Sequence, residues 1–155
     1  MKLLITGGAG YLGSVLTGLA LINQHEVLAV DTLWYNKAVP LSFLNNPRYR
    51  FIRSDISNIL NNKDLFHDID YIVHTAAVVG EPASNKFPEL TRKVNYETSR
   101  QLIDVANKFG VKGFIFLSTC SNYGVSDGIA TEESPLKPLS LYAETKINVG
   151  YLWKS

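Results

Sequence analysis

The feature that most constrains the fold of this sequence is a cluster of glycines close to the N-terminus. A short apolar run over residues 3–6 ends in this cluster, and an amphipathic helical pattern follows directly. Gly7, Gly10 and Gly13 fall three residues apart. Glycine is needed where a strand turns sharply into a helix, because a Cβ would clash at positive φ or block a closely approaching ligand. The first N–H groups of the helix and its macrodipole then predict an anion site suited to a pyrophosphate.

A glycine-rich turn can also serve only as a connection, so its context decides between the two interpretations. Here the cluster follows a predicted strand and precedes a predicted helix, which the binding mechanism requires. Asp31 ends the next predicted strand, about 20 residues on, where the diol of a ribose needs an acceptor. A carboxylate there repels a 2′-phosphate, so the sequence favours NAD over NADP. A turn-capping aspartate is the alternative role for Asp31.

Strand-like apolar runs recur along the chain, with helical patterns between several of them. The predicted strands are mostly continuous, as expected for strands covered on both faces, and span Lys2–Thr6, Glu26–Asp31, Arg50–Arg53, Tyr71–His74 and Gly113–Ser118. Helical stripes are formed by Leu12, Val15, Leu16, Leu19 and Ala20, and within residues 89–109 by Leu102, Val105, Ala106 and Phe109. A third helical pattern runs from Leu141 to Ser155. This alternation predicts an α/β fold, a Rossmann-type doubly wound parallel sheet that stops after its fifth strand and the following helix.

Length, charge and cysteine content exclude several classes of protein. The 155 residues are predicted to form one domain, long enough to bury a core. A net charge of +1 provides no field for binding nucleic acid or an acidic membrane. Cys120 is the only cysteine and is expected to be a small buried thiol, so no intrachain disulfide and no metal site are expected. The first apolar run is too short for a signal-peptide core or a membrane span, and the cytoplasm is the expected compartment.

Polar and small residues follow several predicted strands, at the edge where ligands of open α/β sheets bind. Asp55 could accept a hydrogen bond from an adenine amino group or simply cap the segment after it. His74 is expected to be a satisfied core histidine, whereas the small residues 75–77 would let an extended ligand lie against the backbone. Residues 118–124 carry hydroxyls that could bond a substrate alcohol or serve ordinary turn chemistry.

A tyrosine and a lysine stand four residues apart near the end of the sequence, at Tyr142 and Lys146. This spacing places both side chains on one face of a helix. A free tyrosine has a pKa near 10 and is a poor base at neutral pH, but a nearby ammonium and a positively charged nicotinamide would favour its phenolate form. The same pairing also arises by chance on many exposed helices.

Taken in order, these motifs resemble those of the extended short-chain dehydrogenase/reductases, and most closely the NAD-dependent epimerase/dehydratase family that acts on nucleotide sugars. The resemblance covers essentially the whole chain. The residues that carry it are Thr6-Gly7-Gly8-Ala9-Gly10-Tyr11-Leu12-Gly13, Asp31, Asp55-Ile56, His74-Thr75-Ala76-Ala77, Asn95, Ser118-Thr119-Cys120-Ser121-Asn122-Tyr123-Gly124 and Tyr142 to Lys146.

The resemblance implies an enzyme that transfers a hydride between a sugar carbon and NAD. It implies that Tyr142 is the catalytic base, that Lys146 lowers its pKa and binds the nicotinamide ribose, and that Thr119 is the catalytic hydroxyl. It implies a cofactor site made of Gly7, Gly10, Tyr11, Leu12, Gly13, Asp31, Asp55, Ile56, Thr75, Ala76, Ala77, Tyr142 and Lys146. It further implies substrate contacts from Val79, Ser121 and Asn122, a structural role for Asn95, and a homodimer formed through the helices near 89–109 and 141–155.

Two departures from the family pattern shape the expected reaction. The dehydratase branch carries an Asp-Glu pair after its threonine where this sequence has Cys120 and Ser121, so epimerisation or simple oxidoreduction is favoured over dehydration. Family members are also much longer, and the C-terminal substrate domain is expected to be absent. This leaves two alternatives, a non-catalytic dinucleotide-binding module and a family oxidoreductase that acts on a non-sugar alcohol.

Overall fold

The computed structural model describes residues 1–35, 39–126 and 128–152. Its contacts divide the chain into two compact units. The first unit comprises Met1–Ala76 and Gln101–Phe116, and the second comprises Ala77–Arg100 and Leu117–Ser155. Within the described ranges, no helix is long and apolar enough to cross a membrane.

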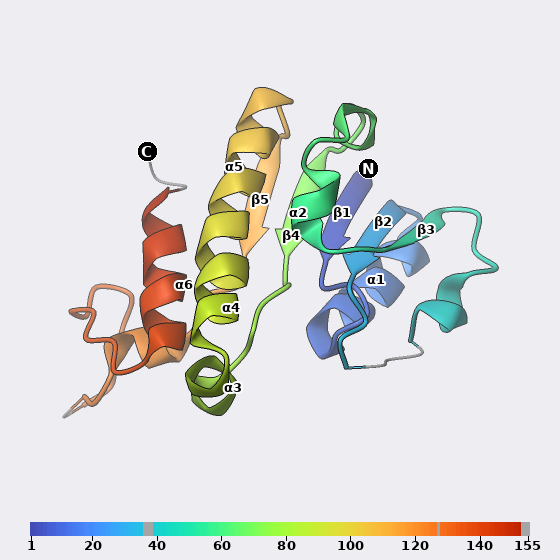
Figure 1. The fold of residues 1–155 in the computed structure, drawn as a ribbon. Helices are drawn as coiled ribbons and strands as arrows, with labels where there is room; N and C mark the ends of the chain where they lie inside the picture. The colour runs from blue at the N-terminus through green and yellow to red at the C-terminus, as the bar shows by residue number, and fades with distance from the viewer. Residues whose placement is uncertain (36–38, 127, 153–155) are drawn as a thin grey trace. The chain divides into compact units, whose positions relative to one another are not determined.

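The first unit is built on a five-stranded parallel sheet with the strand order β3-β2-β1-β4-β5 (Figure 1). Its strands are β1 (Lys2–Thr6), β2 (Glu26–Asp31), β3 (Tyr49–Arg53), β4 (Tyr71–His74) and β5 (Gly113–Phe116). The predicted parallel α/β sheet is therefore confirmed. The fifth strand ends at Phe116 rather than Ser118, and the third begins at Tyr49 rather than Arg50.

The two long crossovers leave the centre of this sheet in opposite directions. Helix α1 (Tyr11–Ile22) connects β1 to β2, whereas a helical run that ends in α5 (Ser99–Lys108) connects β4 to β5 on the other side of β1. Because parallel crossovers are right-handed, α1 and α5 lie on opposite faces of the sheet. The carboxyl ends of β1 and β4 meet where the crossovers diverge, which is where doubly wound sheets bind ligands.

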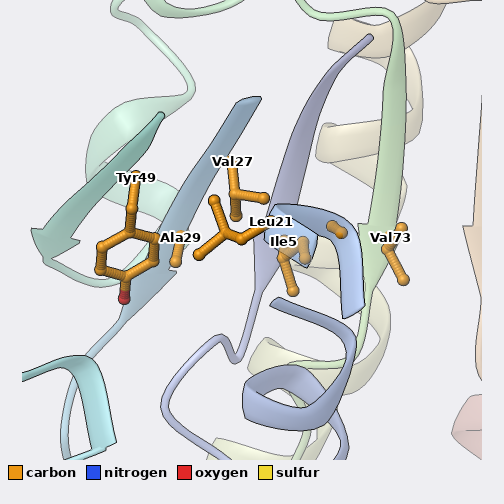
Figure 2. Packing of buried hydrophobic residues seen from close by; sticks show 7 residues of the cluster. Ile5, Leu21, Val27, Ala29, Tyr49 and Val73 are labelled. Carbon is orange, nitrogen blue, oxygen red and sulfur yellow. The ribbon is translucent and has the colours of Figure 1, made fainter. Parts of the chain in front are cut away.

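Small side chains bring α1 close to the sheet. Ala20 and Leu21 pack with Ile5, Val27, Ala29, Tyr49 and Val73 in one buried cluster (Figure 2). The buried residues of α1 are Gly13, Thr17, Ala20 and Leu21. The predicted core stripe was therefore wrong for Leu12, Val15 and Leu19, which are about half exposed. The pattern misled because α1 has no charged residue to mark its outer face.

The helical run before β5 is divided into several segments. It contains α3 (Glu81–Lys86), α4 (Pro88–Arg92), the π-helical segment η3 (Lys93–Thr98) and α5. The predicted helix over residues 89–109 is confirmed in position, and Leu102 and Ala106 of its stripe are buried, together with Ile103. Gly110 adopts a φ of +66° just after α5, and the N–H of Val111 closes onto the carbonyl of Ala106, as expected of a glycine cap.

The rest of the second unit surrounds the last helix, α6 (Leu141–Leu152). Residues 153–155 of the predicted third helix lie outside the described residues. Ser140 caps α6, because its hydroxyl accepts a hydrogen bond from the N–H of Ala143 at 3.2 Å. The remaining short elements of the described chain are α2 (Ile56–Ile59), η1 (Val39–Phe43), η2 (Lys63–Leu65) and η4 (Cys120–Tyr123).

Candidate active site

The glycine turn after β1 is fixed by contacts with both neighbouring strands. Gly7 has a φ of +70°, and its N–H donates to the carbonyl of Val30 at 2.8 Å. A Cβ on Gly7 would lie 2.7 Å from the backbone N of Ala76. A Cβ on Gly13 would lie 2.1 Å from the Gly7 carbonyl oxygen, so only glycine lets α1 start this close to the turn.

Gly10 differs from its two neighbours in the motif. It stands at the N-cap of α1 with an ordinary φ of −74°, and a Cβ there would lie 3.1 Å from the Gly7 oxygen, a contact that a small shift relieves. Protein packing alone therefore does not require a glycine here. The lack of a side chain at Gly10 leaves the helix N-terminus open to a ligand.

The start of α1 has the properties of an anion site. Among the described residues no side chain caps the helix, and its first turn contains no acidic residue. Tyr11 and Leu12 occupy that turn and are largely exposed, so their backbone N–H groups face no side-chain acceptor at the cap. A twelve-residue helix with this N-terminus fits the diphosphate of a dinucleotide.

Asp31 lies at the end of β2 and is held against the glycine turn. Its Oδ2 accepts a hydrogen bond from the N–H of Ala9 at 3.1 Å, and its Oδ1 accepts from the N–H of Leu33 at 2.8 Å. The turn-capping role that the sequence left open is therefore present. The bond to Ala9 also places the carboxylate beside the predicted phosphate cradle, where the ribose role requires it. The two roles are compatible, since each carboxylate oxygen has two lone pairs.

Asp55 and the first residues after β4 belong to the first unit as well. Asp55 caps α2, and its Oδ1 accepts from both the N–H and the hydroxyl of Ser57, so the capping alternative is present. Ile56 buries its side chain. The hydroxyl of Thr75 donates to the carbonyl of Thr6 at 2.6 Å, and the N–H of Ala76 lies 3.4 Å from the hydroxyl of Thr6. Thr75 and Ala76 are thus tied directly to the end of β1.

His74 is a core histidine, as predicted. It is fully buried, its Nδ1 lies 2.6 Å from the hydroxyl of Thr6, and its ring packs against those of Phe114 and Phe116. Its partners are therefore structural ones.

The predicted catalytic residues come together in the second unit. Tyr142 is partly buried at the start of α6 and shares a hydrogen bond with Thr119. The Nζ of Lys146 lies 5.9 Å from the centroid of the Tyr142 ring, as the four-residue spacing predicts. The structure thereby groups a hydroxyl, a phenol and an ammonium. Such a set can accept a proton from an alcohol and stabilise the resulting charge.

The pKa of Tyr142 differs from the expectation. Burial raises it above the ordinary value of 10.0, and the hydrogen bond with Thr119 offsets this only in part. The expected lowering is therefore not found in the protein by itself. The reasoning from the sequence considered the charges around the phenol but not its desolvation, which opposes ionisation.

Lys146 is a buried ammonium with a fixed partner. It is 3% exposed, and its Nζ donates to the carbonyl of Leu117 at 2.9 Å. Burial lowers the pKa of Lys146 from 10.5 to about 8. The carbonyl at the start of the segment after β5 therefore holds the charged end of Lys146 near the phenol.

Asn95 connects the loop after β4 to α6. Its Oδ1 accepts from the N–H of Val78 at 2.8 Å, and its Nδ2 donates to the carbonyl of Val78 at 2.9 Å. The same Nδ2 lies 3.5 Å from the hydroxyl of Thr145, which is next to Lys146. The structural role expected for Asn95 is therefore specific, since it fixes the backbone of Val78 and contacts α6, the helix that carries Tyr142 and Lys146.

The predicted substrate residues have different environments. Val79 and Ser121 are exposed, whereas Asn122 is buried. The Nδ2 of Asn122 donates to the hydroxyl of Ser118 at 2.9 Å, and its Oδ1 has no hydrogen-bond partner within the described part of the chain. Cys120 is exposed, so its expected burial was wrong. It lies in η4, where the chain turns after β5 has ended, rather than in the strand.

Some residues that build these groups were not found by reasoning from the sequence. Gly8 was named only as part of the glycine motif, with no role of its own; it packs against β2, because a Cβ there would lie 2.7 Å from that of Ala29. Leu117 contributes through its carbonyl and Val78 through both backbone groups, so their side chains give no signal in the sequence. The described residues include no group of three or more His, Cys, Asp or Glu side chains able to hold a metal ion.

A parallel sheet with this glycine turn and uncapped helix defines a Rossmann-type protein. The chain belongs to the NAD dependent epimerase/dehydratase family, because the sequence model of that family matches residues 3–154. It is 33% identical over 156 residues to the UDP-glucose 4-epimerase of Corynebacterium glutamicum, covering 97% of this chain and 45% of that protein. It is also 33% identical over 151 residues to the dTDP-glucose 4,6-dehydratase of Streptomyces griseus, covering 93% of this chain and 46% of that protein.

The fold has close counterparts among solved structures. The UDP-glucuronic acid 4-epimerase of Bacillus cereus, in complex with UDP-glucuronic acid and NAD, superposes with a TM-score of 0.91 at 32% identity. The match covers 98% of this chain and 51% of that one. The chain thus spans about half the length of the relatives it matches.

Replacing Asn95 with alanine is expected to destabilise the protein by about 2–4 kcal/mol, because both backbone groups of Val78 lose their buried partner. Urea unfolding measures this loss. Asn107→Ala, at an exposed position of α5, serves as the control and should cost much less. Equal effects of the two substitutions would contradict the role given to Asn95.

The pKa of Lys146 predicts a pH dependence of stability in the cofactor-free protein. The folded protein releases this proton near pH 8, whereas the unfolded chain retains it up to about 10.5. The free energy of unfolding should therefore rise between about pH 8 and pH 10. Urea unfolding across this range should show the rise in the wild type and in Lys108→Met, an exposed control, but not in Lys146→Met. A rise that persists in Lys146→Met would contradict the burial of a charged lysine.

Proposed function

We propose that the chain binds NAD and supplies the acid–base residues of a nucleotide-sugar 4-epimerase or related oxidoreductase. The observation that carries this proposal is the grouping of Thr119, Tyr142 and Lys146, with the phenol hydrogen-bonded to the hydroxyl and the ammonium above its ring. Family membership and relatives whose names state epimerase activity support the same conclusion.

The NAD site is proposed to use the first unit. The diphosphate would lie on the N–H groups at the start of α1, and Asp31 would accept from the ribose hydroxyls. Bound NAD would supply the chemistry of accepting a hydride from a sugar carbon and returning it. Thr75 and Ala76 at the end of β4, with Ala77 after them, offer small side chains along the path of an extended cofactor.

The protein's own residues handle the proton. Tyr142 accepts the hydroxyl proton of the sugar, and Thr119 orients that hydroxyl through its hydrogen bond with the phenol. Lys146 stabilises the phenolate and contacts the nicotinamide ribose. Val79, Ser121 and Asn122 are proposed to contact the substrate. The Oδ1 of Asn122 is buried and has no hydrogen-bond partner among the described residues, so it retains an unused acceptor.

Epimerisation is favoured over dehydration, although dehydratases occur among the relatives. The residues that follow Thr119 are Cys120 and Ser121, and neither is a carboxylic acid able to eliminate water. An oxidoreductase for a non-sugar alcohol would share the same proton chemistry. A non-catalytic NAD-binding module is the second candidate, because the chain spans only about half the length of its relatives.

We further propose that the 155 residues act as one cofactor-binding domain in the cytoplasm, and as a homodimer through the helices near 89–109 and 141–155. Sedimentation equilibrium tests the dimer. A monomer at all concentrations would contradict it.

Replacing Asp31 with asparagine should weaken NAD binding by about tenfold while changing NADP binding much less, since only NAD presents a free 2′-hydroxyl to the carboxylate. Asparagine keeps an acceptor for the N–H of Leu33 but loses the bond from the N–H of Ala9. The loss of that turn contact affects both nucleotides alike, so the difference between NAD and NADP reports the ribose contact. Calorimetric titration of both nucleotides measures the difference. An equal loss for NAD and NADP would remove the ribose role.

Replacing Tyr142 with phenylalanine should reduce turnover by about 100-fold or more while NAD affinity changes by no more than about twofold. Turnover is measured with UDP-glucose and UDP-glucuronic acid, in the 155-residue chain and in a chimera. The chimera replaces the matched half of the Bacillus cereus epimerase with this chain. Tyr151→Phe, an exposed position on the same helix, is the control. NAD binding without turnover in the unsubstituted chimera would favour the non-catalytic module.

A further inference from the structure

Ser118 stands between the two residues that contact the proposed catalytic groups of α6. The carbonyl of Leu117 accepts a hydrogen bond from the ammonium of Lys146 at 2.9 Å. On the other side of Ser118, the side chain of Thr119 is hydrogen-bonded to Tyr142. Both contacts lie within the second unit, where η4 packs against α6 (Figure 1). A bond that fixes Ser118 therefore fixes both of its neighbours at once.

Ser118 makes such a bond, and its partner is Asn122. The Nδ2 of Asn122 donates to the hydroxyl of Ser118 at 2.9 Å, which closes the chain across residues 118–122. Asn122 is the fixed end of this bond, because it is only 8% exposed and its carbonyl accepts from the N–H of Lys137 at 2.9 Å. Ser118 is exposed. The bond therefore ties an exposed residue to a buried and anchored one.

The other hydrogen bonds that close this turn are longer. The N–H of Asn122 lies 3.4 Å from the carbonyl of Thr119, and the N–H of Ser121 lies 3.2 Å from the Thr119 hydroxyl. The N–H of Gly124 lies 3.3 Å from the carbonyl of Ser121. N–H···O bonds usually measure roughly 2.7–3.2 Å, so these three are at or beyond the long end of the range. The side-chain bond of Ser118 is therefore the shortest closure of the turn.

The turn also directs the hydroxyl of Thr119. The oxygen of this hydroxyl accepts from the N–H of Ser121, which leaves its proton for Tyr142. Burial raises the pKa of Tyr142, and the hydrogen bond with Thr119 opposes this, as expected for a proton donated to the phenol oxygen. The ammonium of Lys146 favours the phenolate in the same sense. A turn that moved would weaken both effects.

We propose that Ser118 is a positioning residue, whose hydrogen bond to Asn122 holds the turn in the arrangement that the phenol and the ammonium require. It acts through Leu117 and Thr119, its two neighbours in the chain. This role rests on the proposed function of α6, since it serves the proton transfer assigned there. It is distinct from the substrate contact proposed for Asn122, because the bond to Ser118 uses Nδ2 and leaves Oδ1 unused.

The first arm of the test uses the 155-residue chain and needs no turnover. In Ser118→Ala the turn loses its shortest closing bond, so it should become mobile. The NMR order parameters of the Cys120 and Ser121 amides should then fall from about 0.85 to below about 0.6. The NOE cross-peak between the Thr119 side chain and the Tyr142 ring should weaken by about threefold or more, because the hydroxyl is no longer held at the phenol.

Two control variants isolate the hydroxyl of Ser118. Ser118→Thr keeps this acceptor at an exposed position and should keep the order parameters and the cross-peak of the wild type. Ser126→Ala removes another exposed serine hydroxyl, which bonds to the carbonyl of Gly128 outside the turn, and should also change neither. Wild-type values in Ser118→Ala would overturn the proposal. An equal loss in Ser118→Thr would overturn it as well, because the hydroxyl would not be the group that holds the turn.

The second arm measures turnover of UDP-glucuronic acid by the chimera with the Bacillus cereus epimerase. Ser118→Ala should lower kcat by about tenfold or more and leave KM within about twofold, because the bond positions reacting groups and not the substrate. The acidic limb of the pH–rate profile should move to higher pH, since the phenolate loses support from the hydroxyl and the ammonium. Ser118→Thr and Ser126→Ala should show neither change, and a loss of stability alone would not move the profile.

The two arms separate this inference from the proposed function. A wild-type chimera without turnover would contradict the proposed activity, whereas the first arm would still decide whether Ser118 holds the turn. Unchanged kcat and an unchanged pH profile in an active Ser118→Ala chimera would overturn the positioning role.

Discussion

The turn at Gly7 is the constraint on which the first unit depends. Its N–H is bonded to β2 through Val30, and its carbonyl oxygen leaves no room for a side chain at Gly13. Thr75, at the end of β4, bonds to the carbonyl just before it. One left-handed residue therefore joins the ends of three strands and sets where α1 begins. The direction of the helix N-terminus, and with it the proposed phosphate site, follows from this turn.

The second unit depends on a different feature, a buried lysine whose ammonium is hydrogen-bonded to a backbone carbonyl. Lys146 is almost fully buried, and its ammonium bonds to the carbonyl of Leu117. Burying an ammonium costs free energy of folding that an apolar side chain at the same position would not cost. Buried titratable groups of this kind are often found at functional sites. Burial acts on the neighbouring phenol as well and raises its pKa. The proposed role of Tyr142 as a base at neutral pH therefore requires further positive charge, which bound NAD would supply.

Much of the first unit could be predicted from the sequence because its signals are local. Continuous apolar runs located the strands, and the three glycines located the turn. The outer side of α1 was misassigned, since a helix without charged residues gives no contrast between its faces. The contacts of Asn95 with Val78 and of Lys146 with Leu117 involve backbone atoms distant in sequence, which no side-chain pattern reveals. The pKa of Tyr142 was misjudged for a related reason, because burial depends on packing that the sequence does not display.

The central proposal is that NAD binds at the glycine turn and that Lys146 contacts its nicotinamide ribose. Calorimetric titration of NAD and of ADP into the wild type and Lys146→Met tests it most directly, because ADP carries the diphosphate but lacks the nicotinamide ribose. The account predicts that Lys146→Met weakens NAD by about tenfold or more and leaves ADP within about twofold. Unchanged affinity for both nucleotides would contradict the claim, since Lys146 would then make no contact with the ligand held at the turn.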